Sequence, residues 1–441
     1  MKQFTSHLLA AAAACILTLT SCNDYDTAAI GYEDNNDPDT LATSSEPRLD
    51  SAWNLDLVIN IGQHDNDVWV YRDRLYDAFF TRTLGWNGGD VVASARLSGD
   101  RLLWLVRDSY YGTVDADTRA RLAGTSVRSS LLLQTCDHGT LSNPDAQDLY
   151  VLNPYIQTSD PAAADYYVAE TIYYPADTKF YGVPALAAEW NGKVQVLFGA
   201  YRNTNSRHVS SALTEYVIGT PAGSNALQQQ SHNETLQTNM ISFDDCLLAD
   251  EDGHNYLYCS YLLNGINGVL VARTATHDLG SAWEYYIRDT NGSLVWSETA
   301  PTISSGTLAN ETAQRSNMLT ANGSCQHPQV FKSGDWYYLV GQTYSNGQAV
   351  QIWRSRTPQG PFSDSKRLCV IPGTVAKQGG KDYNALTRVV LHPALSRSGE
   401  LVLSTAQTAY AANDNFTYPG SADYVRPYFY RVFNWQSLWE E

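Results

Sequence analysis

Apolar and polar positions follow the same order five times along this chain. In each segment, a polar or proline-marked start leads into a short apolar strand, a glycine-centred turn and a second strand rich in Val, Leu and Tyr. Two β-forming runs joined by such a turn are typical of a β-hairpin. The pattern therefore predicts five hairpins, at residues 90–108, 184–201, 244–261, 327–341 and 392–404.

The spacing of these hairpins predicts the fold class. Their turn glycines, at positions 99, 192, 253, 334 and 399, leave room in each interval for two further strands, such as 269–273, 350–354 and 428–432. Four-stranded units repeated around an axis form a β-propeller. We expect one all-β, five-bladed β-propeller over residues 51–441, closed by strands from both ends. Two stacked β-sandwiches are the alternative, and they explain the shared hairpin pattern less well.

The first residues predict export and lipidation. Lys2 precedes an apolar run at 8–19, which is too short for a permanent bilayer span of about 20 residues. The run ends in Leu19-Thr-Ser-Cys22, which looks like a lipobox. We expect a signal peptide at 1–21 and a lipid on Cys22, which would anchor the protein to the outer membrane, facing the cell surface. An ordinary signal peptide with a chance cysteine is the alternative.

Residues 22–50 are acidic and contain few large apolar side chains. Such a segment cannot bury enough surface to fold alone, so we expect a solvated tether behind the lipidated cysteine. Its acidic start resembles the surface-export signal of Bacteroidota lipoproteins.

Composition narrows the class of partner. The chain has 29 Lys and Arg against 46 Asp and Glu, a formal charge of −17, which argues against a nucleic-acid binder. Its 29 Tyr and 11 Trp are typical of a β-rich protein with aromatic platforms for sugars. We expect a polysaccharide or oligosaccharide partner and a monomer, in contact with the membrane only through the lipid.

Five cysteines remain after residue 22, and none has C-x-x-C spacing, which argues against a zinc or redox site. Cys246 and Cys259 flank one predicted hairpin. A disulfide between them is possible, but two buried small hydrophobic side chains are the favoured interpretation.

In a propeller the starts of the innermost strands converge on the central funnel. Here these starts carry Asp90, Asp244 or Asp245, His327 and His392. Such a ring is costly unless it is solvated or binds something. A calcium ion on the axis is possible, with the histidines holding waters around it. Alternatively, each His-Pro pair only starts a strand.

Asp90 and Asp108 are the best-defined candidate pair of catalytic carboxylates. Each lies nine residues from Gly99, so a hairpin places them opposite each other, give or take one residue. Carboxylates that close push their pKa values apart, as an acid and a base or nucleophile require. Alternatively, both are ordinary solvated residues. Neighbouring aromatic side chains can stack on a sugar ring: Trp86, Tyr110 and Tyr111.

Several motifs together resemble a family of bacterial lipoproteins. They are Trp86-Asn-Gly-Gly-Asp90, Arg107-Asp108-Ser-Tyr-Tyr-Gly112, Tyr174-Pro-Ala-Asp177, Phe243-Asp-Asp-Cys246, the stretch 354–362 and His392-Pro-Ala-Leu-Ser396. The chain resembles the domains of unknown function numbered 4185 and 5005 over most of its length after about residue 60. The resemblance implies a five-bladed fold similar to glycoside hydrolase families 43 and 32, and an endo-D-arabinanase-like activity. The carboxylates that match by position are Asp90, Asp108, Asp177 and Asp245.

The sequence departs from the family pattern at two positions, where Val91 and Arg107 replace glycines. Arg107 can pair with a funnel carboxylate and depress its pKa, or it can mark a site that has drifted from catalysis.

The leading hypothesis is a surface glycoside hydrolase that requires no cofactor. Asp90 is then the nucleophile or base, and Asp108 or Asp245 is the acid. A carboxylate from another blade, Asp177 or Asp245, is the preferred partner of Asp90, and that separation favours inversion. A non-catalytic glycan-binding lipoprotein is the competing hypothesis, with His327 and His392 contacting the glycan in either case. A single Asp-box pattern at 276–283 makes a sialidase a minor third interpretation.

Overall fold

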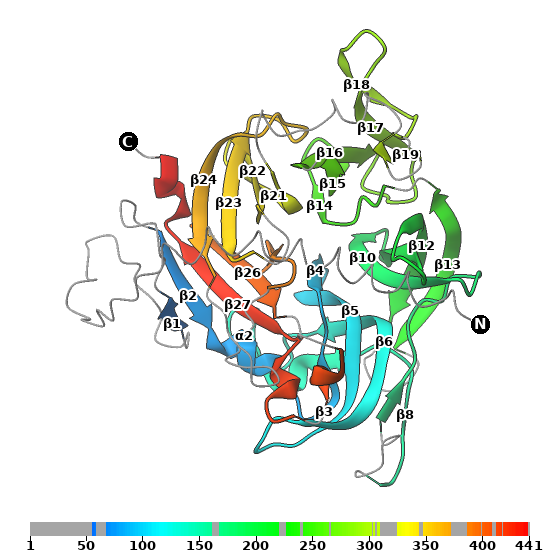
Figure 1. The fold of residues 1–441 in the computed structure, drawn as a ribbon, viewed down its shortest axis with the longest axis vertical. Coiled ribbons are helices and arrows are strands. Elements are labelled where there is room, and N and C mark those ends of the chain that lie inside the picture. Colours follow the sequence, from blue (N-terminus) through cyan, green and yellow to red (C-terminus); the bar gives the residue numbers. More distant parts are fainter. Residues whose placement is uncertain are drawn as a thin grey trace, which may run out of the picture. The chain divides into compact units, whose positions relative to one another are not determined.

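Antiparallel four- and five-stranded sheets account for most of the chain in the computed structural model (Figure 1). The described residues are 55–58, 68–160, 167–219, 226–238, 241–263, 266–301, 303–304, 307–308, 324–343, 347–371, 386–397, 399–407, 412–416 and 418–439. They belong to one unit, Pro47–Glu441. The expected signal peptide, Cys22 and the tether lie outside the described residues.

The first four sheets follow one another along the chain, and we call them blades 1 to 4. Blade 1 consists of β4 (Val92–Leu97), β5 (Arg101–Val114), β6 (Arg121–Gln134) and β7 (Leu149–Val151), with β3 (Leu84–Gly88) pairing with the second half of β5. Blade 2 consists of β10 (Phe180–Trp190), β11 (Lys193–Arg202), β12 (His208–Ile218) and β13 (Leu227–Gln237). Blade 3 consists of β14 (Cys246–Ala249), β15 (Asn255–Leu263), β16 (Ile266–Thr274), β17 (Trp283–Arg288) and β18 (Leu294–Ser297). Blade 4 consists of β21 (Gln326–Ser333), β22 (Trp336–Gln342), β23 (Ala349–Ser355) and β24 (Ser363–Val370).

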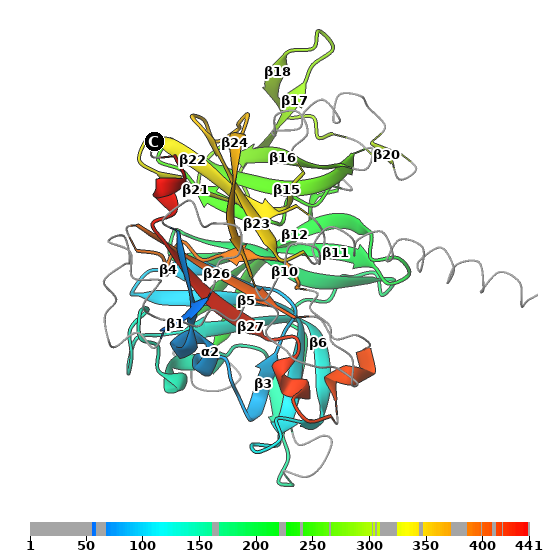
Figure 2. The same ribbon diagram turned by 60° about the vertical axis from the view of Figure 1, so that its left-hand side comes forward.

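Blade 5 combines strands from both ends of the chain. Its order is β25 (Val390–Leu391), β26 (Glu400–Ala406), β27 (Pro427–Phe433), β2 (Trp69–Asp73) and β1 (Leu55–Val58). Figure 1 shows β1, β2 and β27 side by side, and Figure 2 shows β1 and β27 from another direction. The predicted closure by strands from both ends is therefore confirmed.

The remaining elements are short. They are the strand pairs β8 (Tyr155–Gln157) with β9 (Tyr167–Ala169) and β19 (Ile303–Ser304) with β20 (Thr307–Leu308), the α-helix α2 (Arg74–Phe79), and the 3₁₀ helices η2 (Ala146–Asp148), η3 (Ala412–Asn415), η4 (Ser421–Asp423) and η5 (Trp435–Trp439). In the part of the chain that the structure describes, no helix is long and apolar enough to cross a bilayer.

The innermost strands of blades 1 to 4 are the predicted hairpins, whereas in blade 5 the first strand, β25, ends at Leu391, before the predicted start, and residues 393–395 form a turn. All five turn glycines have positive φ, between 56° at Gly334 and 93° at Gly253, a conformation that favours glycine. The predicted outer strands 269–273, 350–354 and 428–432 lie within β16, β23 and β27.

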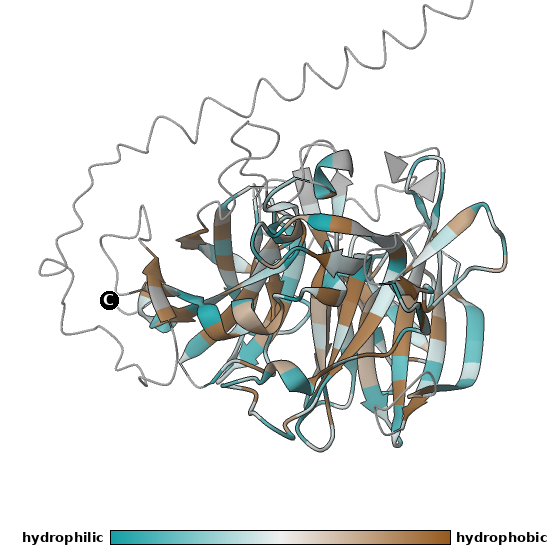
Figure 3. Ribbon diagram, turned by 90° about the horizontal axis from the view of Figure 1, so that it is seen from below, coloured by the Kyte–Doolittle hydropathy of each residue, from teal (hydrophilic) through white to brown (hydrophobic). Residues whose placement is uncertain are grey.

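Five apolar clusters lie between neighbouring blades, and together they close the ring. Each cluster joins one blade to the next through pairs such as Leu103 with Phe198, Leu197 with Leu257, Tyr258 with Leu339, Val340 with Leu403, and Phe429 with Trp104. Figure 3 shows the hydrophobic residues concentrated along the strands. Because blade 5 packs against both blade 4 and blade 1, the fold is a five-bladed β-propeller, not two sandwiches.

A buried ion triad fastens blade 5. Arg431 on β27 contacts Asp73 on β2 and Glu400 on β26, each at 2.7 Å, and all three side chains are at most 2% exposed. Asp73 also accepts hydrogen bonds from the backbone at Leu75 and Tyr76, which starts α2.

The hairpin register decides between the two interpretations of Cys246 and Cys259. Cys246 pairs with Tyr258, so Cys259 is one position further along and faces the other side of the sheet. Both cysteines are free and buried, in different apolar clusters. The favoured interpretation, two buried small hydrophobic side chains, is confirmed.

Candidate active site

A cavity of about 300 Å³ lies where strand starts and strand ends of blades 1, 2, 4 and 5 converge. Its lining contains two carboxylates, two arginines, a histidine and two tyrosines, together with four smaller side chains: Asp90, Asp108, Arg107, Arg388, His327, Tyr181, Tyr201, Val91, Val183, Ser206 and Thr387. We call it the funnel cavity. A larger cavity of about 1210 Å³, the axial channel, is lined by the innermost strands of all five blades.

The two residues before Asp90, Gly88 and Gly89, are packed so closely against neighbouring atoms that neither position has room for a side chain. A Cβ on Gly88 would lie 2.3 Å from the guanidinium of Arg121, and a Cβ on Gly89 would lie 2.1 Å from Val106. Arg121 is 1% exposed and donates to the side chain of Asn87 and to the carbonyls of Ser421 and Tyr424. This buried guanidinium therefore ties the segment before Asp90 to η4.

A β-bulge then aims Asp90 into the funnel cavity. Its backbone N–H donates to the carbonyl of Arg107 at 2.9 Å, while the N–H of Arg107 donates to the carbonyl of Val91 at 3.1 Å. Two residues of one strand thus face one residue of the other, an arrangement that is common beside active sites. Beyond the bulge the register is regular, with Val92 opposite Val106, as the hairpin count from Gly99 predicts.

The two carboxylates of the funnel cavity differ in their surroundings. No described residue donates a hydrogen bond to the carboxylate of Asp90, and burial, followed by the charge of Asp108, raises its pKa to about 6. Asp108 has a left-handed φ of 40°, is 39% exposed and contacts Arg128 at 2.6 Å. A group with a raised pKa beside a paired carboxylate is the arrangement expected of an acid and a base or nucleophile.

Arg107 does pair with a carboxylate, as the sequence allowed, but the partner is Asp244. The contact is 2.8 Å, and Tyr201 donates its hydroxyl hydrogen to the same oxygen at 2.6 Å. Burial opposes ionisation of Asp244, but Arg107 and Arg388 outweigh it and hold the pKa of Asp244 well below its usual range.

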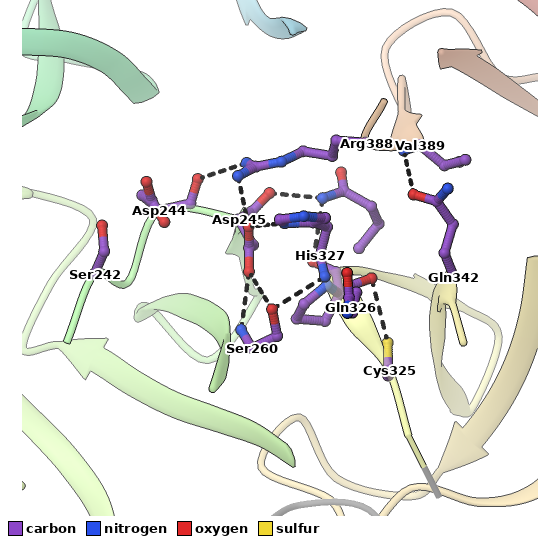
Figure 4. A network of polar contacts seen from close by, with 12 residues as sticks. Ser242, Asp244, Asp245, Ser260, Cys325, Gln326, His327, Gln342, Arg388 and Val389 are labelled. Atoms are coloured by element: carbon purple, nitrogen blue, oxygen red, sulfur yellow. Dashed lines mark hydrogen bonds and ion pairs between the residues drawn. The ribbon is translucent and has the colours of Figure 1, made fainter. Parts of the chain in front are cut away.

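Asp245 lies beneath the funnel cavity, where it lines the axial channel. One of its oxygens contacts both His327 at 2.9 Å and Arg388 at 3.0 Å, and the other accepts the N–H of Ser260 at 2.8 Å (Figure 4). Burial opposes ionisation here too, but Arg388 and then His327 lower the pKa of Asp245. Such a carboxylate is a poor proton donor, and it serves better to orient His327 and Arg388.

The fourth matched carboxylate is elsewhere. Asp177 is exposed on the loop before β10, where it accepts the backbone N–H of Lys179, and it does not line the funnel cavity. The structure thus brings Asp90 and Asp108 together, while Asp245 contacts the lining residues His327 and Arg388 and Asp177 lies apart.

Two of the three predicted sugar platforms are core residues. Trp86 is 2% exposed and Tyr111 is 1% exposed, both in the cluster between blades 5 and 1, so neither ring has a free face. Tyr110 is partly buried between Arg121 and Phe416, and its hydroxyl accepts from Asn415. The prediction of Trp86 and Tyr111 as stacking residues is wrong, because alternate residues of a strand face opposite sides.

The aromatic residues that do line the funnel cavity were missed. Tyr181 and Tyr201 stack at 5.8 Å, and Arg128 lies over Tyr181 at 4.7 Å. A count from the turn glycine would have found one of them, because Tyr201 follows Gly192 by nine residues, as Asp108 follows Gly99. Arg388 had no comparable signal, since it precedes its strand outside any motif.

The two histidines have different environments. His327 lines the funnel cavity, with a left-handed φ of 52°. His392 is fully buried between the hydroxyls of Ser94 and Ser404, and burial lowers its pKa to about 3. The prediction of His392 as a glycan contact is therefore wrong.

Of the two histidines considered around a calcium ion, only His327 lines the funnel cavity. The described residues include no group of three or more His, Cys, Asp or Glu side chains that could hold a metal. His392 is in the core, and His327 is engaged by Asp245.

The Asp-box pattern forms the turn between β16 and β17. Asp278 accepts the N–H of Gly280, and Trp283 donates to the carbonyl of Leu279. These are contacts within the turn, so the motif has a structural role here.

Comparisons with known proteins agree with this architecture. The crystal structure of a "putative hydrolase" from Bacteroides ovatus matches with a TM-score of 0.82 and 37% identity, covering 91% of this chain and 99% of that one. A GH43_1 enzyme from Xanthomonas citri complexed with xylotriose matches with a TM-score of 0.40 and 15% identity, covering 80% of this chain and 88% of that one. No curated protein matches in sequence.

The family model described as "Domain of unknown function (DUF5005)" matches residues 73–435. This range contains blades 1 to 4, the strands β25, β26 and β27 of blade 5, and every lining residue of the funnel cavity. The chain therefore belongs to the DUF5005 family, as its motifs predicted.

Proposed function

We propose that this protein is a glycoside hydrolase whose active site is the funnel cavity. The observation that carries the proposal is the pair of neighbouring carboxylates, Asp90 and Asp108, of which only Asp108 has a cationic partner. Hydrolysis of a glycosidic bond requires one protonated and one ionised carboxyl group on either side of the scissile bond.

The environments of the two groups assign their roles. Asp90, with a pKa of about 6, is the general acid that protonates the leaving oxygen. Asp108, which contacts Arg128, attacks the anomeric carbon and displaces the leaving group, and Asp90 then activates the water that releases the sugar. This reverses the assignment preferred from the sequence, in which Asp90 was the nucleophile or base.

The proposed substrate is a polysaccharide, and an arabinofuranose-containing glycan is the first candidate. Its support is the family resemblance of the motifs around Asp90 and Asp108, together with a relative called a hydrolase. The lining tyrosine Tyr181 offers a ring for a sugar, and most of the other lining side chains are charged or polar.

The experiment is a hydrolysis screen with protein lacking residues 1–22. Arabinans, mycobacterial arabinogalactan, fructans and pectic glycans are each incubated with the protein, and reducing ends are measured. We expect release from one of them, and loss of at least about 10³-fold in kcat for both Asp90→Asn and Asp108→Asn. Release that survives either substitution refutes the paired mechanism.

Binding without catalysis is the second candidate function. The observation that favours it is Arg128, which in this structure contacts the carboxylate that would have to attack the sugar. Affinity electrophoresis on the same glycans distinguishes the two: retardation without product, at every pH from 4 to 8, supports binding alone.

We also propose that the protein is anchored to the outer membrane by a lipid on Cys22, facing the cell surface. The lipobox-like sequence before Cys22 and the acidic segment after it support this. Cys22→Ala should move the protein from the membrane fraction to the soluble fraction, and external protease should remove the wild-type protein from intact cells. Membrane association that persists in Cys22→Ala contradicts the anchor.

A further inference from the structure

The funnel cavity contains a pair of polar groups that the proposed carboxylate mechanism does not use. His327 from blade 4 and Arg388 from the start of blade 5 both line the cavity, and both contact the same oxygen of Asp245. Because Nδ1 of His327 and Nη2 of Arg388 converge on one atom, the two side chains lie next to each other (Figure 4).

Arg388 retains an unused donor. Its side chain is 9% exposed, and its Nε–H is buried with no hydrogen-bond partner among the described residues. The other nitrogens contact Asp245 and the carbonyl of Asp244. A buried donor without an acceptor is costly, so this position is suited to an oxygen atom brought by a ligand.

His327 retains an unused acceptor. The nitrogen that faces the carboxylate of Asp245, Nδ1, is a donor in the tautomer that has its single hydrogen there. The other nitrogen, Nε2, is then an acceptor, and no described residue bonds to it. The left-handed φ of 52° at His327 is rare for a non-glycine residue, and contacts from Ser260 and Asp245 hold it there.

An adjacent donor and acceptor select for one kind of group. A hydroxyl can accept from Nε–H of Arg388 and donate to Nε2 of His327 at the same time, whereas a carboxylate or an ether oxygen can satisfy only the arginine. We infer that Arg388 and His327, held by Asp245, form a recognition site for one free hydroxyl of the sugar that occupies the funnel cavity. This inference rests on the proposed function and names the feature of the substrate that the cavity requires.

Two conservative substitutions each remove one of the two groups that would bind the hydroxyl, either the donor of Arg388 or the acceptor of His327. Arg388→Lys keeps a cation for Asp245 but has no Nε–H. His327→Asn keeps an N–H for Asp245, tolerates the left-handed conformation and has no group at the position of Nε2. Arg356→Lys and His277→Asn are matched controls, because both residues line the axial channel and not the funnel cavity.

The test measures binding in an Asp90→Asn background, which removes turnover. The probes are the methyl glycosides of arabinofuranose, xylopyranose, galactopyranose and fructofuranose, each with its singly deoxygenated analogues, titrated by NMR. We expect one glycoside to bind, one of its deoxy analogues to bind at least about tenfold more weakly, and Arg388→Lys or His327→Asn to abolish that difference. The controls should preserve it.

The outcomes separate this inference from the proposed function. A glycoside that binds with every deoxy analogue equally tight, or a discrimination that survives both substitutions, overturns the hydroxyl site and leaves the hydrolase proposal to its own screen. If no probe perturbs the cavity although the screen finds hydrolysis, the inference also fails. Folding of the variants is verified by unchanged melting temperatures.

Discussion

Asp90 lies beside Asp108 in the funnel cavity, and the charge of Asp108 adds to burial in raising the pKa of Asp90 to about 6. Neither blade 2 nor blade 3 supplies a better partner for Asp90, since Asp177 is outside the lining and Asp245 is bound from two sides. The preference for a partner from another blade is therefore not supported.

The first prediction concerns stereochemistry. Residues that neighbour each other across a hairpin have Cβ atoms about 4.5–5.5 Å apart, which suits the short carboxyl separation of about 5–5.5 Å in retaining glycosidases. We expect the anomeric configuration to be retained in the first product, observed by ¹H NMR within the first minutes of hydrolysis. An inverted anomer would require a water between the carboxyl groups and would contradict the direct attack by Asp108.

The second prediction concerns the pH dependence of activity. If Asp90 is the general acid, it must be protonated in the free enzyme, so kcat/KM should fall about tenfold per pH unit above a pKa of about 6. A rate profile measured between pH 4 and 8 on the substrate found in the screen checks this. A rate that instead rises through pH 6 would return Asp90 to the role of base or nucleophile.

The third prediction concerns stability. The folded-state pKa of Asp90, about 6, lies above its usual value of 3.8, so the folded state binds this proton more tightly. Its contribution to stability is full below about pH 4 and is lost as the pH rises through 6. Asp90→Asn should therefore raise the free energy of unfolding at pH 8, by about 3 kcal/mol, and leave it nearly unchanged at pH 4.

Urea unfolding at the two pH values measures that difference. Asp117→Asn, on an exposed turn, is the control and should change stability by less than about 0.5 kcal/mol at either pH. Equal effects of Asp90→Asn at pH 4 and pH 8 would show that the carboxylate is not destabilised by its surroundings.

The fourth prediction contrasts two aromatic residues. Trp86→Ala empties a core position and should cost about 3–5 kcal/mol of unfolding free energy. Tyr181→Ala removes a ring from the funnel cavity and should raise KM about tenfold while changing stability little. Urea midpoints of both variants test the predicted difference in stability, and steady-state kinetics of both variants test the predicted difference in KM. A Tyr181→Ala enzyme with unchanged KM would exclude that ring from the substrate site.

The fifth prediction concerns the buried ion triad. Arg431→Met leaves Asp73 and Glu400 buried without their cation, which should destabilise the protein by about 3–5 kcal/mol. Lys179→Met, at an exposed position, is the control. If the two substitutions have the same effect on the urea midpoint, the triad does not stabilise the closure of blade 5.

The fold could be predicted from the sequence because hairpins are local. The turn glycine, the alternation and the register of a hairpin are all specified within about twenty residues, so counting from Gly99 placed Asp90 beside Asp108. The same count would have placed Tyr201, and the clusters between blades follow from the apolar face of each strand.

The rest of the site depends on contacts between blades, which no local pattern specifies. His327 and His392 both precede a proline, yet one faces the cavity and the other is packed against Trp104 and Phe429. Tyr110 and Tyr111 are adjacent and alike in chemistry, but they face opposite sides of β5. The pairing of Arg107 with Asp244 and of Arg388 with Asp245 joins residues more than a hundred positions apart.

Pairing between β2 and β27 also affects how the chain reaches its folded state. Tyr71 and Arg431 are 360 positions apart in sequence and neighbours in the sheet. Blades 1 to 4 each contain only consecutive strands and can form as soon as their own residues are available, whereas blade 5 must wait for the last strand. During synthesis, the apolar faces of blades 1 and 4 that blade 5 covers stay exposed until the end. We therefore expect closure to be the slow step of folding, and a chain interrupted before residue 427 to aggregate.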